Sequence, residues 1–142
     1  MAIAWTPDLS IGIREIDEQH QEMFRQINNL LEAFDQGKGP EGVSQMIAFL
    51  EKHVIEHFGA EENYMFRFKY PNDAHHRIQH RIFRRNLLNL KSRLDTEGAS
   101  GPLLDATHGL VVMWLHDHIR NVDKLLGSFL KTRLEKQGVP LS

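Results

Sequence analysis

Four long segments of this chain carry apolar residues at the three- and four-residue spacing of an α-helix, and proline or glycine separates each segment from the next. That period places the apolar side chains of each segment on one face, which must be buried against another element. No stretch sustains the alternation of apolar and polar residues that is typical of a strand bounded by turns. The sequence therefore predicts an all-α fold in which every helix contributes one face to a shared core.

Proline, glycine and capping residues set the expected limits of the four helices. Residues before the first helix are expected to form an irregular arm. Short connections between long helices favour antiparallel neighbours, so we expect an antiparallel up-down-up-down four-helix bundle with an irregular N-terminal arm. The helices are predicted from a cap at Asp17 to about Gln36, from Pro40 to about Phe68, from a cap at Asn72 or Asp73 to near Gly98, and from Pro102 towards Gly138.

Length and composition narrow the choice of organisation and partner. A chain of 142 residues has the size of one ordinary domain, so we expect residues 1–142 to form a single domain. With 17 basic and 19 acidic residues, the formal net charge of -2 gives no reason to expect nucleic acid or an anionic membrane as a partner. No apolar run approaches the ~20 residues that span a bilayer, and the first residues lack the basic region and long apolar stretch of a signal peptide. We therefore expect a cytoplasmic protein with no membrane span.

Histidines and carboxylates interrupt the apolar stripes. A buried carboxylate without a partner costs several kcal/mol, and the arginine and lysine side chains lie off the stripes. A metal ion is the partner that we expect, and because the chain has no cysteine, imidazole and carboxylate must hold it. The seven candidate ligands are His20, His57, Glu61, His76, His80, His118 and Asp123. The stripes read His20, Phe24, Ile27, Leu31, Phe34; Val43, Ile47, Leu50, Val54, His57, Glu61, Met65; His76, His80, Phe83, Leu87, Leu90, Leu94; and Leu104, Val111, Leu115, His118, Val122, Leu125, Phe129.

The spacing of the ligands along each helix is favourable except at one place. His57 and Glu61 are four residues apart, as are His76 and His80, so each pair projects from one helix face. His118 and Asp123 are five apart, and on a straight α-helix they would diverge by roughly 140°. We therefore predict a local π-helical distortion between them, which an unbroken α-helical hydrogen-bond ladder would exclude.

The number and kind of ligands indicate two metal ions. Five nitrogens with two carboxylates are too many for one tetrahedral zinc ion and match two octahedral ions that share bridges. Glu61 and Asp123 are the natural bridges, because a carboxylate has two oxygens whereas a ligating imidazole nitrogen has one lone pair. The five histidines then divide three and two, which leaves an open position on the ion with two. A site dominated by neutral imidazole also favours reversible exchange with a peroxide-level adduct over bond-breaking oxidation.

The sequence resembles the hemerythrin family, specifically its single-domain bacterial members, over almost its whole length. The resemblance rests on short motifs at matching intervals: Gly12-Ile13, Ile16-Asp17-Glu18-Gln19-His20, His57-Phe58, Glu61-Glu62, Met65, Tyr70-Pro71, His76, His80, Phe83, Trp114-Leu115, His118-Ile119 and Asp123-Lys124.

The resemblance implies a non-haem di-iron centre that binds dioxygen reversibly, for oxygen storage, transport or delivery, in a protein that is not an enzyme. It implies two iron ions bridged by Glu61, Asp123 and an oxo or hydroxo group. By analogy, His76, His80 and His118 hold the saturated ion, while His20 and His57 hold the ion that accepts oxygen. Leu115 and Ile119 match apolar positions that flank the oxygen pocket. The expected partners are dioxygen and a redox or oxygen-accepting protein.

Two other functions stay open. An oxygen or redox sensor would be favoured by a fused signalling domain. A di-iron enzyme such as a peroxidase is less favoured, because the apolar pocket expected at the open iron offers no acid or base besides the ligands. The other histidines, His53, His75, His108 and His116, are expected to lie outside the site.

Overall fold

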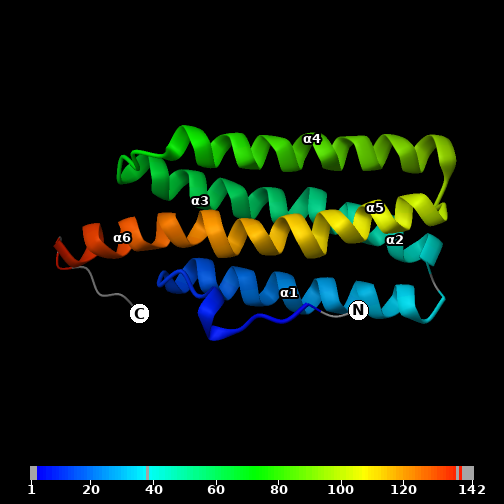
Figure 1. The fold of residues 1–142 in the computed structure, drawn as a ribbon, viewed down its shortest axis with the longest axis horizontal. Coiled ribbons are helices and arrows are strands. Elements are labelled where there is room, and N and C mark those ends of the chain that lie inside the picture. Colours follow the sequence, from blue (N-terminus) through cyan, green and yellow to red (C-terminus); the bar gives the residue numbers. More distant parts are fainter. Residues whose placement is uncertain (1–2, 38, 137, 139–142) are drawn as a thin grey trace.

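The computed structural model describes residues 3–37, 39–136 and 138, and within these ranges every regular element is helical. Four helical rods lie side by side and alternate in direction, which confirms the antiparallel four-helix bundle (Figure 1). The rods are α1 (Arg14–Asp35); α2 (Gly39–Phe49), η2 (Leu50–Val54) and α3 (Ile55–Arg67); α4 (Asp73–Glu97); and α5 (Gly101–Gly109), η3 (Leu110–Leu115), η4 (His118–Asp123) and α6 (Lys124–Lys136). Among the described helices, none combines the length and the apolar character needed to cross a bilayer.

The irregular N-terminal arm is present and is tied to α1 by side chains of that helix. The amide of Ile3 donates to Oδ1 of Asn28, and Nδ2 of Asn28 donates to the carbonyl of Ile3, both at 2.7 Å. Further along, the carboxylate of Asp17 accepts hydrogen bonds from the Ser10 hydroxyl and the Ile11 amide. The prediction of Asp17 as a helix cap is therefore wrong. Its carboxylate binds the arm, and α1 begins before it, at Arg14.

The other helix limits are close to those predicted. Ser100, which the sequence reading did not single out, caps α5 by accepting a hydrogen bond from the Leu103 amide at 3.2 Å, with Pro102 in the first turn. Gly98 ends α4 with a φ of 71°, a left-handed conformation that favours glycine. Asn72 occupies the cap position of α4 without a side-chain hydrogen bond.

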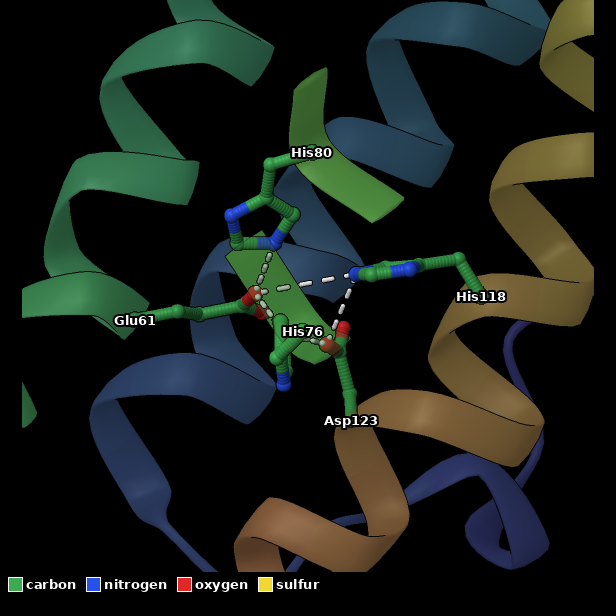
Figure 2. A group of neighbouring side chains, drawn as sticks. All are labelled: Glu61, His76, His80, His118 and Asp123. Atoms are coloured by element: carbon green, nitrogen blue, oxygen red, sulfur yellow. Dashed lines mark hydrogen bonds and ion pairs between the residues drawn. The ribbon is translucent and has the colours of Figure 1, made fainter. Parts of the chain in front are cut away.

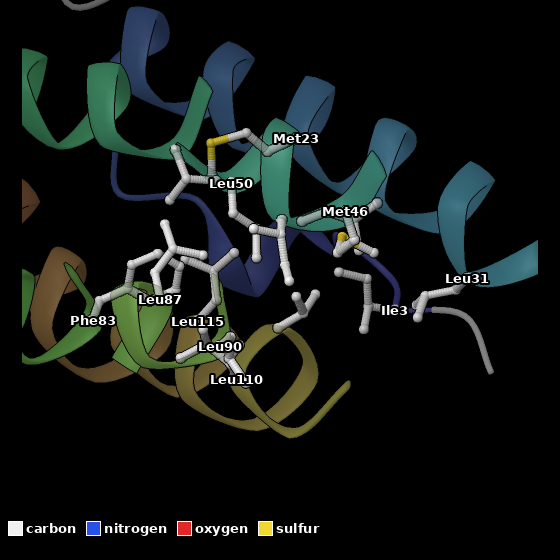
Figure 3. Packing of buried hydrophobic residues seen from close by; sticks show 14 of the residues in the cluster. Ile3, Met23, Leu31, Met46, Leu50, Phe83, Leu87, Leu90, Leu110 and Leu115 are labelled. Carbon is white, nitrogen blue, oxygen red and sulfur yellow. The ribbon is translucent and has the colours of Figure 1, made fainter. Parts of the chain in front are cut away.

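Two apolar clusters fill the bundle, one on each side of a polar layer. The larger cluster includes Met23, Leu50, Leu87 and Leu115, which point toward one another between the helices (Figure 3). Along α1, for example, His20 lies between Ile16 of the smaller cluster and Met23 of the larger one. The two clusters therefore enclose the polar layer. The smaller cluster consists of Ile11, Ile13, Ile16, Met65, Phe68, Tyr70, Leu126 and Leu130.

The predicted apolar stripe of the fourth rod is wrong beyond His118, where Val122, Leu125 and Phe129 were expected in the core. Leu125 is 59% exposed, and Val122 and Phe129 are only partly buried. Because η4 is π-helical, it holds one residue more than an α-helical turn and shifts every later position by one. The buried positions are instead Asp123, Leu126 and Leu130.

The other described positions of the predicted stripes are buried as expected, with two exceptions. Leu94 and Leu104, at the ends of two stripes, are only partly buried. Phe34 lies outside the described side chains.

Candidate metal centre

All seven candidate ligands lie in the polar layer, and none is more than 5% exposed. Every rod contributes at least one of them, so the layer joins the four helices at a single level. His20 comes from α1, His57 and Glu61 from α3, His76 and His80 from α4, and His118 and Asp123 from η4.

The π-helical turn η4 carries His118 and Asp123 at its two ends. The wider turn returns a residue five positions along to the same face of the helix, and Nε2 of His118 lies 3.0 Å from Oδ1 of Asp123. The predicted distortion is therefore confirmed. Two further π-helical turns, η2 and η3, were not anticipated.

Glu61 divides its two carboxylate oxygens between two sets of histidines. Oε1 lies 2.9 Å from Nε2 of His80, 3.1 Å from that of His76 and 3.8 Å from that of His118 (Figure 2). Oε2 lies 2.9 Å from Nε2 of His57 and 3.5 Å from that of His20. Every histidine thus presents Nε2, and one carboxylate faces both sets.

Asp123 divides its oxygens in the same way. Oδ1 lies 3.1 Å from Nε2 of His76 and 3.0 Å from that of His118, whereas Oδ2 lies 3.2 Å from Nε2 of His20. Two groups of potential ligands result, and in each the donor atoms lie within 4.8 Å of one another. One group is Glu61, His76, His80, His118 and Asp123, and the other is His20, His57, Glu61 and Asp123.

These donors fit a metal site better than a hydrogen-bonded core. Several buried donor atoms lie close together without the alignment of a hydrogen bond, whereas buried polar atoms in proteins normally have such a partner. Ligand atoms that surround a metal position are expected to lie close together in this way, because each is directed at the ion and not at another ligand. Imidazole nitrogen and carboxylate oxygen together suit iron, zinc and manganese. The atoms without a hydrogen-bond partner include Nε2 of His20, His57 and His118, Oε2 of Glu61 and both carboxylate oxygens of Asp123.

Without a metal, protons on the imidazoles balance the buried carboxylates. Burial by itself lowers the pKa of His20, but the carboxylates of Asp123 and Glu61, at 3.2 and 3.5 Å from its Nε2, outweigh burial and raise that pKa to about 9. The same balance raises the pKa of His118 to about 10. The pKa values of Glu61 and Asp123 are lowered despite burial, because the surrounding imidazoles stabilise both carboxylates. A metal ion would replace these protons.

Two residues outside the candidate set orient histidines by accepting a hydrogen bond from the ring nitrogen that faces away from the site. The Nδ1–H of His57 donates to Oε1 of Gln19 at 2.5 Å, and the Nδ1–H of His80 donates to Oε2 of Glu62 at 3.2 Å. Each bond leaves Nε2 free to face the site. Sequence reasoning assigned no role to Gln19 or Glu62, although each directly adjoins a candidate ligand, because the spacing within one helix does not show which residue of another helix it meets.

Aromatic rings close the site on the side of the larger apolar cluster. The ring of Phe58 stacks on His80 with a centroid distance of 3.9 Å and an interplanar angle of 8°. The indole of Trp114 stacks on His118 at 4.9 Å and 9°. Leu115 and Ile119, expected at an oxygen pocket, are both buried and flank His118 in the sequence.

The four remaining histidines lie outside both groups of potential ligands, which the described residues define. His53 and His75 are exposed, and His108 and His116 are partly buried. The expectation that these histidines are not part of the cluster agrees with their positions.

Comparison with known proteins gives a consistent match. Residues 11–130 match the model of the hemerythrin HHE cation binding domain. The chain is 33% identical to the bacteriohemerythrin of Pseudomonas aeruginosa (strain LESB58) over 121 residues, which cover 85% of this chain and 76% of that one. It is 29% identical to the bacteriohemerythrin of Methylococcus capsulatus over 90% of this chain and 96% of that one. It is also 28% identical to a hemerythrin-like protein of Naegleria gruberi over 84% of this chain and 86% of that one. No solved structure matches.

Proposed function

This chain belongs to the hemerythrin family, and from that premise we propose that it binds dioxygen reversibly at a pair of iron ions, for oxygen storage, transport or delivery. The proposed cofactor is two iron ions bridged by Glu61, Asp123 and an oxo or hydroxo group. When bound, the two ions supply the two electrons that reversible dioxygen binding requires.

The observation that carries this proposal is the unequal division of donors between the two groups. Both groups share the carboxylates of Glu61 and Asp123, but one adds three histidines and the other adds two. An ion that favours six ligands is closer to saturation in the group with His76, His80 and His118. The group with His20 and His57 therefore offers the position for dioxygen.

The residues around the site favour reversible binding of dioxygen over its conversion to released peroxide. Leu115 and Ile119 are 1% and 0% exposed, and we propose that their side chains line the oxygen pocket. Apolar walls exclude water and slow the proton transfer that would release peroxide. The proposed pocket walls are apolar side chains and supply no acid or base for enzymatic turnover, so the proposal is oxygen binding and not catalysis.

The proposal is tested by reducing the iron-loaded protein without air, adding oxygen and then applying vacuum, with visible spectra at each step. We expect a charge-transfer band that appears with oxygen and disappears under vacuum while the iron returns to the reduced state. Rapid, irreversible oxidation would contradict reversible binding. Turnover of an added peroxide and phenol would favour a peroxidase instead.

A further inference from the structure

We propose that a groove between α1 and the second rod is the route by which divalent metal ions reach the site. The proposal rests on the metal centre proposed above and adds a second, weaker cation site outside it. The groove has a volume of about 470 Å³ and is lined by Glu15, Glu18, Gln19, Glu22, Met23, Gln26, Phe49, His53, Glu56 and His57.

The lining residues change in character from the rim to the floor. The carboxylates and His53 are exposed, Gln19 and Gln26 are partly buried, and Met23 and His57 are buried. His57 is 5% exposed, and its Nε2 has no hydrogen-bond partner. The groove therefore leads from charged groups in solvent to the imidazole of His57, whose Nδ1 is bonded to Gln19 of the same groove and whose Nε2 faces Glu61 in the metal centre.

The rim keeps a negative charge despite two neighbouring arginines. Glu18 pairs with Arg14 at 3.0 Å, and Glu22 pairs with Arg25, but both pairs are exposed and therefore weak. Glu15 accepts a hydrogen bond from the Tyr64 hydroxyl, which leaves its charge in place. Four carboxylates against two arginines leave about two negative charges at the mouth of one groove, which concentrates cations there.

The donor chemistry of the rim suits the transfer of a metal ion. Carboxylate and imidazole are the same donor types that make up the buried site. The exposed imidazole of His53 lies one helical turn before His57 and shares the groove with it. A divalent ion can therefore exchange one ligand at a time on its way to the group formed by His20, His57, Glu61 and Asp123.

A second groove also reaches a candidate ligand but is poorly suited to cations. It has a volume of about 200 Å³ and is lined by Gln79, Trp114, Asp117, His118, Asn121 and Val122. It carries one carboxylate, and the indole of Trp114 covers the face of His118. Electrostatic attraction therefore favours the groove along α1.

The rate of metal uptake tests this route. The metal-free protein is mixed with Co²⁺ in a stopped-flow instrument at low and high salt, and the cobalt absorption band is followed. The groove variant is Glu18→Gln, Glu22→Gln and Glu56→Gln together. The control variant is Asp95→Asn, Asp105→Asn and Glu135→Gln, three exposed carboxylates outside the groove. Both variants change the net charge by the same amount.

We expect the groove variant to take up Co²⁺ about tenfold more slowly than wild type at low salt, and the control variant to differ by no more than about twofold. The difference between the variants should shrink at high salt. Equal rates in the two variants would overturn the route while leaving the metal centre intact. A wild-type protein that takes up no Co²⁺ would overturn both proposals.

A second measurement does not require metal-free protein. Mn²⁺ is added in small amounts to zinc-filled, isotope-labelled wild type and to the zinc-filled groove variant. We expect the amide signals of residues 15–26 and 49–56 to broaden first in wild type and to broaden much less in the variant. Uniform broadening over the surface of both proteins would overturn the groove as a cation site.

Discussion

At the scale of single residues, Glu61 and Asp123 differ from the five histidines because each belongs to both groups of potential ligands. A carboxylate can do this since its two oxygens face in different directions, whereas an imidazole presents one nitrogen to the site. Loss of a carboxylate should therefore affect both metal positions, and loss of one histidine should mainly affect the group that contains it.

The substitutions Glu61→Ala and His57→Ala test this difference. Glu61→Ala should lose most of the iron from both positions and should destabilise the fold by about 3–5 kcal/mol, because buried imidazoles lose their compensating charge. His57→Ala should mainly lose the ion of the two-histidine group. Iron per chain, measured by mass spectrometry, and thermal unfolding report both effects.

His75→Ala is the matched control, since His75 is an exposed histidine on the same helix as two candidate ligands. It should change neither iron content nor thermal stability. Equal iron content in all three variants would contradict the assignment of the ligands.

The raised pKa values of His20 and His118 lead to a pH dependence of metal binding. With pKa values of about 9 and about 10, both imidazoles carry protons at neutral pH in the metal-free protein, and a metal ion must displace them. The affinity for Zn²⁺ should therefore rise with pH up to these values, by as much as about tenfold per pH unit for each proton displaced. Calorimetry in two buffers of different ionisation enthalpy measures the protons released, and an affinity independent of pH would contradict this prediction.

The metal-free protein should show the opposite trend on the alkaline side. Its protonated His20 and His118 stabilise the fold fully below the ordinary histidine pKa of 6.5, and this contribution is lost as the pH rises through about 9 and about 10. The pKa values of Glu61 and Asp123 are lowered in the folded protein, so their carboxylates stabilise the fold until they are protonated, and this stability is lost as the pH falls into the acid range. Thermal unfolding of the metal-free protein across pH measures both limits.

At the scale of elements, η4 explains how two ligands five residues apart share one helix face. The extra residue of the π-helical turn also shifts the buried face of α6, so that Leu126 and Leu130 enter the core. The turn therefore serves both the site and the packing beyond it.

Deletion of Asn121 tests this account of η4. Removing one exposed residue should convert the turn to α-helix while keeping Leu126 on the buried face, so the fold should survive. Deletion of Asn86, an exposed residue in the regular helix α4, should rotate Leu87 and the positions after it by about 100° out of the core. Circular dichroism and thermal unfolding should show a much larger loss for the Asn86 deletion, and equal losses would contradict the account.

At the scale of the whole molecule, the N-terminal arm packs closely against the last helix. A Cβ added at Gly127 would lie 2.1 Å from the carbonyl oxygen of Ile11 and 2.6 Å from the Ile11 Cβ. Backbone atoms of the arm therefore occupy the space that any other side chain would need. Ile11 belongs to the smaller apolar cluster, so this contact closes one end of the core around the polar layer.

Gly127→Ala should therefore displace the arm and lower stability by about 1–3 kcal/mol, although alanine is the better helix former. Gly59→Ala is the matched control, because Gly59 is also helical but, apart from its chain neighbours and the backbone of its own helix, has no atom within 4 Å of an added Cβ. That variant should gain up to about 1 kcal/mol. Chemical denaturation measures both changes, and a stabilised Gly127→Ala protein would contradict the close contact.

The sequence by itself was sufficient to predict the four helices, their alternating direction and the seven residues of the polar layer. These properties depend on spacing along one helix, such as the four residues between His57 and Glu61, or on turn residues such as Gly98. The five-residue step from His118 to Asp123 even indicated the π-helical turn, since no α-helix places both on one face.

Only the tertiary structure decided which atoms of different helices meet. The division of the Glu61 oxygens, the contact of Gln19 with His57 and the groove along α1 all depend on how neighbouring helices are placed and rotated. The helical period of a sequence determines which residues share a face, but rotation of one helix by a single residue, as in η4, changes every contact that follows. The sequence therefore determined the set of potential ligands, and the packing of the four helices decided how that set divides into two unequal groups.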